Sequence, residues 1–186
     1  MNHSRGCDII MLSDRCKCAV ETKPSRPRML WLLFMLQKRK NIKMIKLIDI
    51  TPDNWRTRLQ TSEEQKRYVA NTAVLLARAY AYREQRSRAF IVCSDETPVG
   101  MGLYYDLPDM ECYDLSQFFI DERYQGQGLG RAASMAILNA MREDGKYKKV
   151  ALCYVEGNET AQRLYESLGF CETDRDGDEI GMELIL

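Results

Sequence analysis

The order of predicted elements in this chain of 186 residues indicates a mixed α/β fold, with one central, mostly antiparallel sheet flanked by helices. Two observations predict it. Strand-like and helix-like periodicities follow one another along residues 44–186, and short turns separate neighbouring strands. The expected order is strand, helix, three strands, helix, strand, helix and two strands. A chain of this length fits one domain with a tail.

The first half of this order begins with a strand at Met44–Ile50, closed by a turn or helix start at Thr51-Pro52-Asp53. Glu63–Arg83 is rich in Ala, Leu and Arg and predicts a helix, whose apolar stripe is Val69, Ala73, Leu76, Ala77 and Tyr80. Three strands follow, at Phe90–Cys93, Val99–Tyr105 and Tyr113–Ile120.

The second half opens with a helix at Leu129–Arg142, whose predicted apolar stripe is Leu129, Ala132, Ala133, Ala136, Ala140 and Met141. A strand at Lys149–Val155 and a helix at Glu159–Ser167 come next. Phe170–Leu186 predicts a hairpin that turns at Asp176-Gly177.

Charge divides the chain into two unlike parts. Residues 1–43 carry ten Lys/Arg and three acidic residues, which gives +7, so residues 44–186 hold 17 basic and 24 acidic residues, which gives −7. An acidic domain argues against nucleic acid as a partner and suits a cationic substrate. We expect residues 1–43 to be a disordered basic extension or a non-native start. Its apolar run, Met29–Leu36, is shorter than the roughly 20 residues that span a bilayer, so no membrane partner is expected, although attachment to a membrane surface stays an alternative.

Cysteine and histidine usage limits the chemistry. The seven cysteines are odd in number and include no C-x-x-C pair, which favours a reducing, cytoplasmic location. We interpret Cys112 and Cys153 as core residues. The single histidine is His3, so residues 44–186 have no Ser-His-Asp or Cys-His system and no histidine-based metal site. We therefore expect no metal.

The most informative segment is Phe118–Arg131, FFIDERYQGQGLGR, where a strand leads through a glycine-rich turn into a helix. A helix N-terminus presents unpaired N–H groups and a partial positive charge. Glycines at 126, 128 and 130 let the backbone approach an anion closely. These features predict a pyrophosphate site, to which Arg131 adds a charge-assisted contact. The segment fits neither the P-loop nor the dinucleotide fingerprint.

These residues resemble the GNAT acetyltransferases. Gln125-Gly126-Gln127-Gly128-Leu129-Gly130 matches the Q/R-x-x-G-x-G/A signature, and Asn158-x-x-Ala161-x-x-Leu164-Tyr165-Glu166-x-x-Gly169-Phe170 matches a second family motif. FFIDERYQGQGLG and ANTAVLLARAYAY resemble the bacterial spermine/spermidine (diamine) N-acetyltransferases more closely. The resemblance covers residues 44–186.

The resemblance implies the GNAT acyl-CoA N-acyltransferase fold, acetyl-CoA as cosubstrate and a homodimer. It places Asn158 on the pantetheine arm and Tyr165 beside the CoA sulfur. The implied cofactor-binding residues are Phe118, Phe119, Ile120, Gln125, Gly126, Gln127, Gly128, Leu129, Gly130, Arg131 and Asn158.

Acetyl transfer to an amine requires a neutral amine, a polarised carbonyl and a protonated leaving thiol. Tyr165, with an ordinary pKa near 10, is expected to protonate the thiolate. Asp114 lies eleven residues before Gln125 and resembles by its spacing the strand base of some GNAT enzymes. Polyamine-type relatives often carry an acid where this chain has Ser116, so we expect Asp114 to act through water held by Ser116. A backbone N–H of Phe118–Ile120 is expected to polarise the carbonyl.

Residues 106–122 contain six acidic residues and no Lys or Arg, which favours a small cationic amine as acceptor. The expected substrate-binding residues are Glu111, Asp114, Ser116 and Glu122. A polyamine or diamine is the leading hypothesis. An aminoglycoside, an amino acid or a protein N-terminus are alternative acceptors, and a weakly active CoA-binding sensor module is an alternative of another class.

Overall fold

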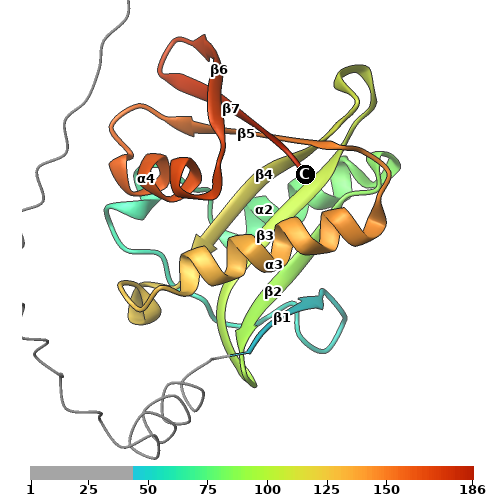
Figure 1. The fold of residues 1–186 in the computed structure, drawn as a ribbon. Helices are drawn as coiled ribbons and strands as arrows, with labels where there is room; N and C mark the ends of the chain where they lie inside the picture. The colour runs from blue at the N-terminus through green and yellow to red at the C-terminus, as the bar shows by residue number, and fades with distance from the viewer. Residues whose placement is uncertain (1–43) are drawn as a thin grey trace, which may run out of the picture. The chain divides into compact units, whose positions relative to one another are not determined.

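A computed structural model of the chain describes residues 44–186, and Figure 1 shows their backbone. The strands are β1 (Ile45–Asp49), β2 (Arg88–Ser94), β3 (Thr97–Leu107), β4 (Cys112–Ile120), β5 (Lys149–Val155), β6 (Cys171–Asp176) and β7 (Glu179–Ile185). The α-helices are α2 (Thr72–Ala81), α3 (Leu129–Asp144) and α4 (Glu159–Leu168). Short 3₁₀ turns lie at η1 (Gln65–Arg67), η2 (Arg83–Gln85), η3 (Pro108–Met110) and η4 (Glu122–Tyr124).

The seven strands form one sheet in the order β1-β2-β3-β4-β5-β7-β6. All neighbouring strands pair antiparallel except β4 and β5, which are parallel. Parallel neighbours need a crossover, and α3 supplies it. The predicted mixed α/β fold with a mostly antiparallel sheet is confirmed.

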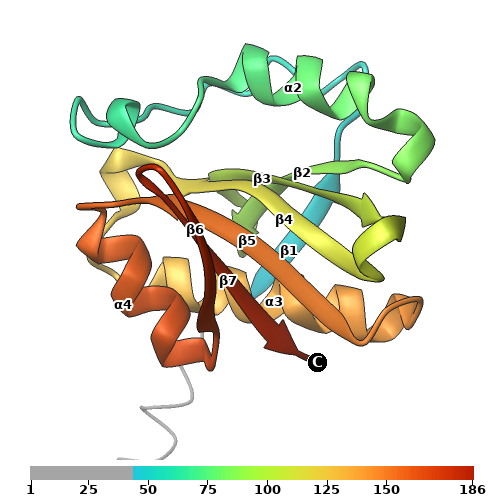
Figure 2. The same ribbon diagram turned by 90° about the horizontal axis from the view of Figure 1, so that it is seen from above.

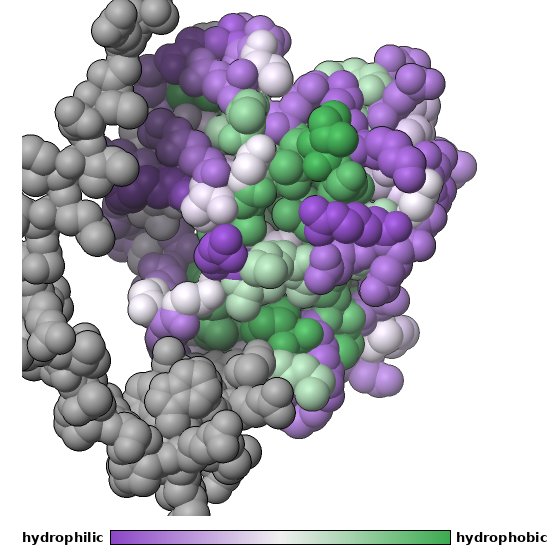
Figure 3. All heavy atoms as spheres, viewed as in Figure 1, coloured by the Kyte–Doolittle hydropathy of each residue, from purple (hydrophilic) through white to green (hydrophobic). Residues whose placement is uncertain are grey.

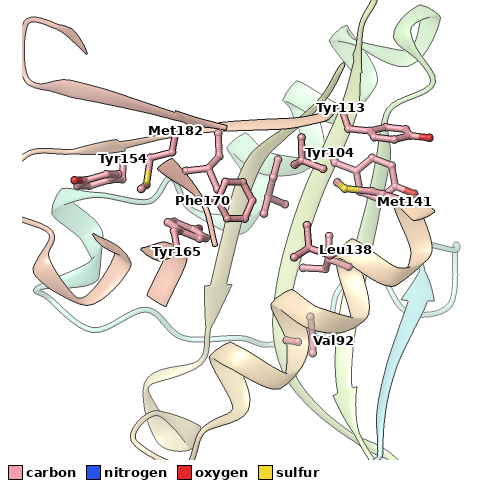
Figure 4. Close-up of a cluster of buried hydrophobic side chains, with 14 of the residues drawn as sticks. Val92, Tyr104, Tyr113, Leu138, Met141, Tyr154, Tyr165, Phe170 and Met182 are labelled. Atoms are coloured by element: carbon pink, nitrogen blue, oxygen red, sulfur yellow. The ribbon is translucent and has the colours of Figure 1, made fainter. Parts of the chain in front are cut away.

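The described domain has three layers. Seen from above, α2 lies on one face of the sheet, and α3 and α4 lie on the other (Figure 2). Each face has its own buried core. The core on the α2 side is centred on Leu75, Met101, Leu103 and Phe119. The core on the α3 and α4 side is larger and contains Tyr104, Leu138 and Tyr165 (Figure 4).

Helix α3 confirms the position of the predicted helix but not all of its predicted stripe. Leu129, Ala133 and Met141 are buried as expected, whereas the other three predicted alanines are only half-buried. The remaining buried positions are Ser134, Ile137 and Leu138. The buried side chains of α3 therefore repeat every three to four residues, and the face that they form is rotated about the helix axis from the predicted apolar stripe.

The helix predicted at Glu63–Arg83 is too long. Helix α2 begins at Thr72, because the side chain of Asn71 caps it by accepting a hydrogen bond from the N–H of Val74 at 3.0 Å. Apart from η1, residues 63–71 are irregular. The predicted apolar position Tyr80 is 69% exposed, whereas Leu75 is fully buried. Alanines on several sides of this helix hid the true direction of its buried face.

Strands β4 and β5 separate soon after they meet. Their register pairs Tyr113 with Val150 and Asp114 with Ala151 and extends no further. Along the rest of β4, the edge that faces β5 has no strand partner, so its backbone N–H and C=O groups are available to other partners. This opening lies along β4, the strand that carries the expected site residues Asp114, Ser116 and Phe118–Ile120.

The face that carries α3 has an apolar centre surrounded by hydrophilic residues (Figure 3). Met135 on α3 and Ile185 at the end of β7 are large hydrophobic residues that are 46% and 70% exposed. Scattered side chains of this kind are ordinary on protein surfaces, so we attach no function to them.

The expectations for residues 1–43, including the apolar run Met29–Leu36, lie outside the described residues. None of the helices within residues 44–186 has the length and apolar character that crossing a bilayer requires.

Leu75 is the only fully buried residue of α2 and anchors this helix to the sheet. We predict that Leu75→Ala lowers the free energy of unfolding by about 2–5 kcal/mol, because it leaves a cavity under the helix. The measurement is urea denaturation. The neighbouring Val74 is 45% exposed, so Val74→Ala should change stability by less than about 0.5 kcal/mol. Equal losses in both variants would contradict the assigned anchor.

Candidate active site

The glycine-rich turn between β4 and α3 adopts the backbone that the sequence predicts. Gly126 and Gly128 have φ values of 70° and 75°, which favour glycine, and a Cβ at either would meet no atom within 4 Å. Gly128 caps α3, and Ala132 makes the first helical hydrogen bond to its carbonyl. The N–H groups of the first turn thus have no partner within the helix and face an open approach. This backbone fits a pyrophosphate.

Two glutamine side chains fix the end of β4. The amides of Gln65 and Gln125 donate to the Ile120 carbonyl at 2.9 and 3.0 Å. The Gln125 side chain therefore holds the turn in place, while its backbone stays part of the loop. Gln65 ties the irregular segment before α2 to the same carbonyl.

Asp121 makes a second connection at this point. Its buried carboxylate accepts from the Gln60 N–H at 2.8 Å and from the guanidinium of Arg123 at 2.6 and 2.8 Å. The Arg123 hydrogen bonds lower the pKa of Asp121 from its ordinary 3.8 to about 2, against the opposing effect of burial. Asp121 is therefore a structural carboxylate.

A cleft of about 490 Å³ runs from the glycine turn between β4 and α4. Nine of the eleven predicted cofactor-binding residues line it: Phe118, Phe119, Ile120, Gln125, Gly126, Gly128, Leu129, Gly130 and Asn158. Gln127 and Arg131 are not among its lining residues. The guanidinium of Arg131 donates to the Ser167 carbonyl at 3.3 Å and to the Met135 sulfur, so it lies along α3 and toward α4.

A smaller cavity of about 200 Å³ lies on the α2 side of the opening between β4 and β5. It shares part of its wall with the cleft, namely Tyr68, Val69, Phe118, Asn158, Ala161 and Tyr165. The two hollows therefore meet where β4 and β5 have separated. A long ligand in the cleft and a small one in the cavity would come together at these residues.

Tyr165 lies at this junction. It is 9% exposed and its ring packs edge-on against Phe170, with 5.6 Å between the ring centres (Figure 4). Its hydroxyl makes no hydrogen bond to any other described residue. Burial, followed by the nearby Cys153, raises the pKa of Tyr165 to about 12. The phenol therefore stays protonated at neutral pH.

Asn158 has a structural role as well as a place in the wall. Its side chain caps α4 by accepting from the Ala161 N–H at 3.1 Å. Both hollows include Asn158 in their walls. Capping fixes the orientation of the side chain at the junction.

Asp114 and Ser116 lie on the α2 side of the sheet, and both hydrogen bond to Tyr105. Burial raises the pKa of Asp114, while the Tyr105 hydrogen bond and the charge of Arg78 oppose the rise. Arg78 on α2 donates to the Ser116 hydroxyl at 3.1 Å. Ser116 lines the small cavity, whereas Asp114 is not among its lining residues.

The acidic residues of 106–122 do not form one surface. Asp106 is buried between Arg86 and Lys146, and Asp121 is bound to Arg123. Glu111 precedes β4 and Glu122 belongs to η4, and neither lines the cleft or the cavity. The acidic residues of 106–122 therefore give less support to a cationic acceptor than their number in the sequence suggests.

The interpretation of Cys153 as a core residue is wrong, whereas Cys112 is buried as expected. Cys153 is exposed and lines the small cavity. It faces the α2 side of β5, where β4 no longer pairs with β5 and the β7 residue opposite it is Gly181, which has no side chain to cover it. Cys171 on the edge strand β6 is also exposed.

Several residues of the two hollows were not identified from the sequence. Tyr68 and Val69 line both, and Arg78 and Glu179 line the small cavity. The capping residue Asn71 was the signal that could have separated Tyr68 and Val69 from the helix. Glu179, at the start of β7, has no local motif that marks it. Within residues 44–186, no group of His, Cys, Asp and Glu side chains is arranged to hold a metal ion.

The profile of the acetyltransferase (GNAT) family matches residues 46–170, which is most of the described domain and contains the glycine turn, the cleft and Tyr165. The chain belongs to the GNAT acetyltransferase family. It is accordingly an acetyl-CoA-dependent N-acetyltransferase.

Curated relatives agree with this assignment. The chain is 33% identical over 134 residues to a spermine/spermidine N(1)-acetyltransferase of Bacillus subtilis, covering 66% of this chain and 85% of the relative. It is also 46% identical over 78 residues to a mycothiol acetyltransferase of Nocardiopsis dassonvillei, which covers 41% of this chain and 22% of that protein.

Solved GNAT structures share the fold. The spermidine N-acetyltransferase of Vibrio cholerae, in complex with CoA and spermine, has a TM-score of 0.62 at 18% identity, covering 76% of this chain and 95% of that chain. The ribosomal-protein-S18-alanine N-acetyltransferase of Escherichia coli has a TM-score of 0.57 at 20% identity, covering 76% and 94%. At these identities the likeness concerns the fold.

Asp121 should contribute to stability in a pH-dependent way. Its pKa is lowered on folding, so its contribution is complete above pH 4 and disappears as the pH falls through about 2. We predict that Asp121→Asn is less stable than wild type at pH 7 and that the difference shrinks as the pH falls from about 4 to 2. Denaturant unfolding at each pH measures it. A difference that does not change with pH would contradict the assignment.

Gly128 should matter for both folding and cofactor binding. We predict that Gly128→Ala costs about 1–2 kcal/mol of stability, because φ is positive, and raises the Kd for CoA at least fivefold, because the loop shifts. Gly145 is a matched control: it ends α3 with φ 68° and lines neither hollow. Gly145→Ala should lose similar stability and keep the wild-type Kd in calorimetric titration. Equal Kd changes in the two variants would argue against the loop as the phosphate site.

Proposed function

We propose that this GNAT enzyme transfers the acetyl group of acetyl-CoA directly to a primary amine of a small cationic acceptor, most simply a polyamine or diamine. The observation that carries the proposal is the meeting of a long cleft and a small cavity at Tyr165, beside the unpaired edge of β4. The Bacillus subtilis relative, a spermine/spermidine acetyltransferase by name, supports this class of acceptor.

The cleft supplies what acetyl-CoA needs. The N–H groups at the start of α3 would bind the pyrophosphate, and the open β4 edge would hydrogen bond the pantetheine amides beside Asn158. The bound thioester supplies the acetyl group. A backbone N–H in Phe118–Ile120 would lie against its carbonyl oxygen and stabilise the negative charge that develops there.

Asp114 is the proposed general base. A primary alkylamine has a pKa near 10.4, so it is mostly charged at neutral pH and must lose a proton before it attacks. The raised pKa of Asp114 strengthens it as a base. The proton would pass from the amine through a water at Ser116 to the carboxylate.

Tyr165 is the proposed general acid. Its phenol lies at the junction of the two hollows and has a pKa raised to about 12. It would donate its proton to the departing thiolate and regain one from solvent. The raised pKa keeps the phenol of Tyr165 protonated over the pH range in which the amine loses its proton.

The proposal extends to the setting of the enzyme. None of the described cysteines forms a disulfide, which supports a reducing compartment, and we propose the cytoplasm. We also propose a homodimer, on the resemblance to the family, and gel filtration with light scattering tests it.

The decisive experiment measures CoA release by the full chain with acetyl-CoA and spermidine, spermine, putrescine, kanamycin and short peptides. We expect turnover with at least one polyamine. Tyr165→Phe should lower kcat at least tenfold and leave the KM for acetyl-CoA within about threefold, because only the proton donor is lost.

Tyr80 on α2 is 69% exposed and provides the control: Tyr80→Phe should keep the wild-type kcat. Turnover of peptides or kanamycin without polyamines would redirect the acceptor assignment. A protein that binds acetyl-CoA and acetylates no amine would be a sensor module.

A further inference from the structure

The small cavity holds two charged residues of opposite sign, Arg78 from α2 and Glu179 from the start of β7. Neither takes part in an ion pair with any residue that the structure describes. Arg78 donates to Ser116, and the carboxylate of Glu179 hydrogen bonds with the Cys153 thiol. Both side chains are exposed and border the space beside Tyr165, and the charge of Arg78 also acts on Asp114.

Gln117 adds an unused acceptor to the same wall. It is 6% exposed, and its Nε2 donates to the Ala70 carbonyl at 2.7 Å, which fixes the orientation of the amide. Its Oε1 is buried and makes no hydrogen bond to the described residues. A buried acceptor without a partner is unfavourable, and an N–H donor from a ligand would satisfy it. An ammonium group carries three such donors.

We propose that Glu179 is the carboxylate that binds the reacting end of the amine acceptor, with Gln117 as a second acceptor, and that Arg78 limits how closely a second ammonium follows it. This inference rests on the proposed amine acceptor and assigns its recognition to residues outside the acidic stretch of the sequence. A carboxylate and an amide oxygen bind an ammonium by charge-assisted hydrogen bonds.

The size of the cavity explains the role of Arg78. Drug-sized ligands fill about 300–1,000 Å³, so a cavity of about 200 Å³ admits only one end of a long amine. The repulsion between the guanidinium and a second ammonium falls as the distance grows. A short diamine brings its second charge close to Arg78, whereas a long one carries it out of the cavity. The pair Glu179 and Arg78 therefore selects for the spacing of charges in the acceptor.

Calorimetric binding of amines to the full chain saturated with CoA tests this without requiring turnover. The ligands are 1,3-diaminopropane and 1,8-diaminooctane. Glu179→Gln should raise the Kd of both at least fivefold. Arg78→Gln should lower the ratio of the two Kd values, short over long, at least threefold. Both effects should weaken in high salt, because they are electrostatic.

Asp178 provides the matched control, since it precedes Glu179 in the same hairpin and lines neither hollow. Asp178→Asn removes the same charge and should leave both Kd values within twofold. The inference is overturned if Glu179→Gln binds the amines as tightly as wild type, or if Asp178→Asn weakens binding as much as Glu179→Gln does. It is also overturned if the Kd ratio is unchanged in Arg78→Gln.

The outcome is separable from that of the proposed function. A wild-type protein that acetylates amines while Glu179→Gln binds them normally keeps the proposed function and loses this inference. A wild-type protein that binds amines through Glu179 and acetylates none keeps Glu179 as the amine-binding carboxylate and loses the proposed function.

Discussion

The separation of β4 from β5 is the constraint on which the rest of the site depends. The two strands pair only at Tyr113 and Asp114, and the edge of β4 beyond them has no strand partner. Sheets normally satisfy such edge groups with another strand. Here the opening leaves the backbone groups of β4 available to a ligand, exposes one side of β5, and joins the cleft to the small cavity at Tyr165. A ligand in the cleft and a ligand in the small cavity can meet only where two neighbouring strands of the sheet have separated.

The gap would not keep its shape without the contacts around Ile120 and Asp121. Gln65 and Gln125 both donate to the Ile120 carbonyl, and Asp121 binds the Gln60 N–H. These bonds tie together the segment before α2, the end of β4 and the glycine turn. Leu75 is the fully buried side chain that holds α2 on the sheet. The position of Arg78 at the cavity therefore depends on this anchor, because Arg78 lies on the same helix.

Sequence reasoning succeeded where chemistry is local and failed where it depends on tertiary packing. The glycine turn and α3 are encoded by adjacent residues, because positive φ at Gly126 and Gly128 and a helix start are local properties. The start of α2 was missed because alanine-rich periodicity outweighed the capping signal of Asn71. Glu179 is far from the other cavity residues in the sequence and reaches them only through the pairing of β7 with β5, which no single segment reveals.

Cys153 shows how the same gap bears on chemoselectivity. Its thiol lines the small cavity near Tyr165 and is therefore a potential rival to the amine for the acetyl group. Exchange between a thioester and a thiol proceeds through the thiolate. Although Cys153 is exposed overall, partial desolvation of its thiol, reinforced by the charge of Glu179, raises the pKa of Cys153 and keeps the thiol protonated. The carboxylate assigned to binding the amine thus also protects the enzyme from acylating itself, because the same negative charge holds the cationic acceptor and keeps the competing thiol protonated.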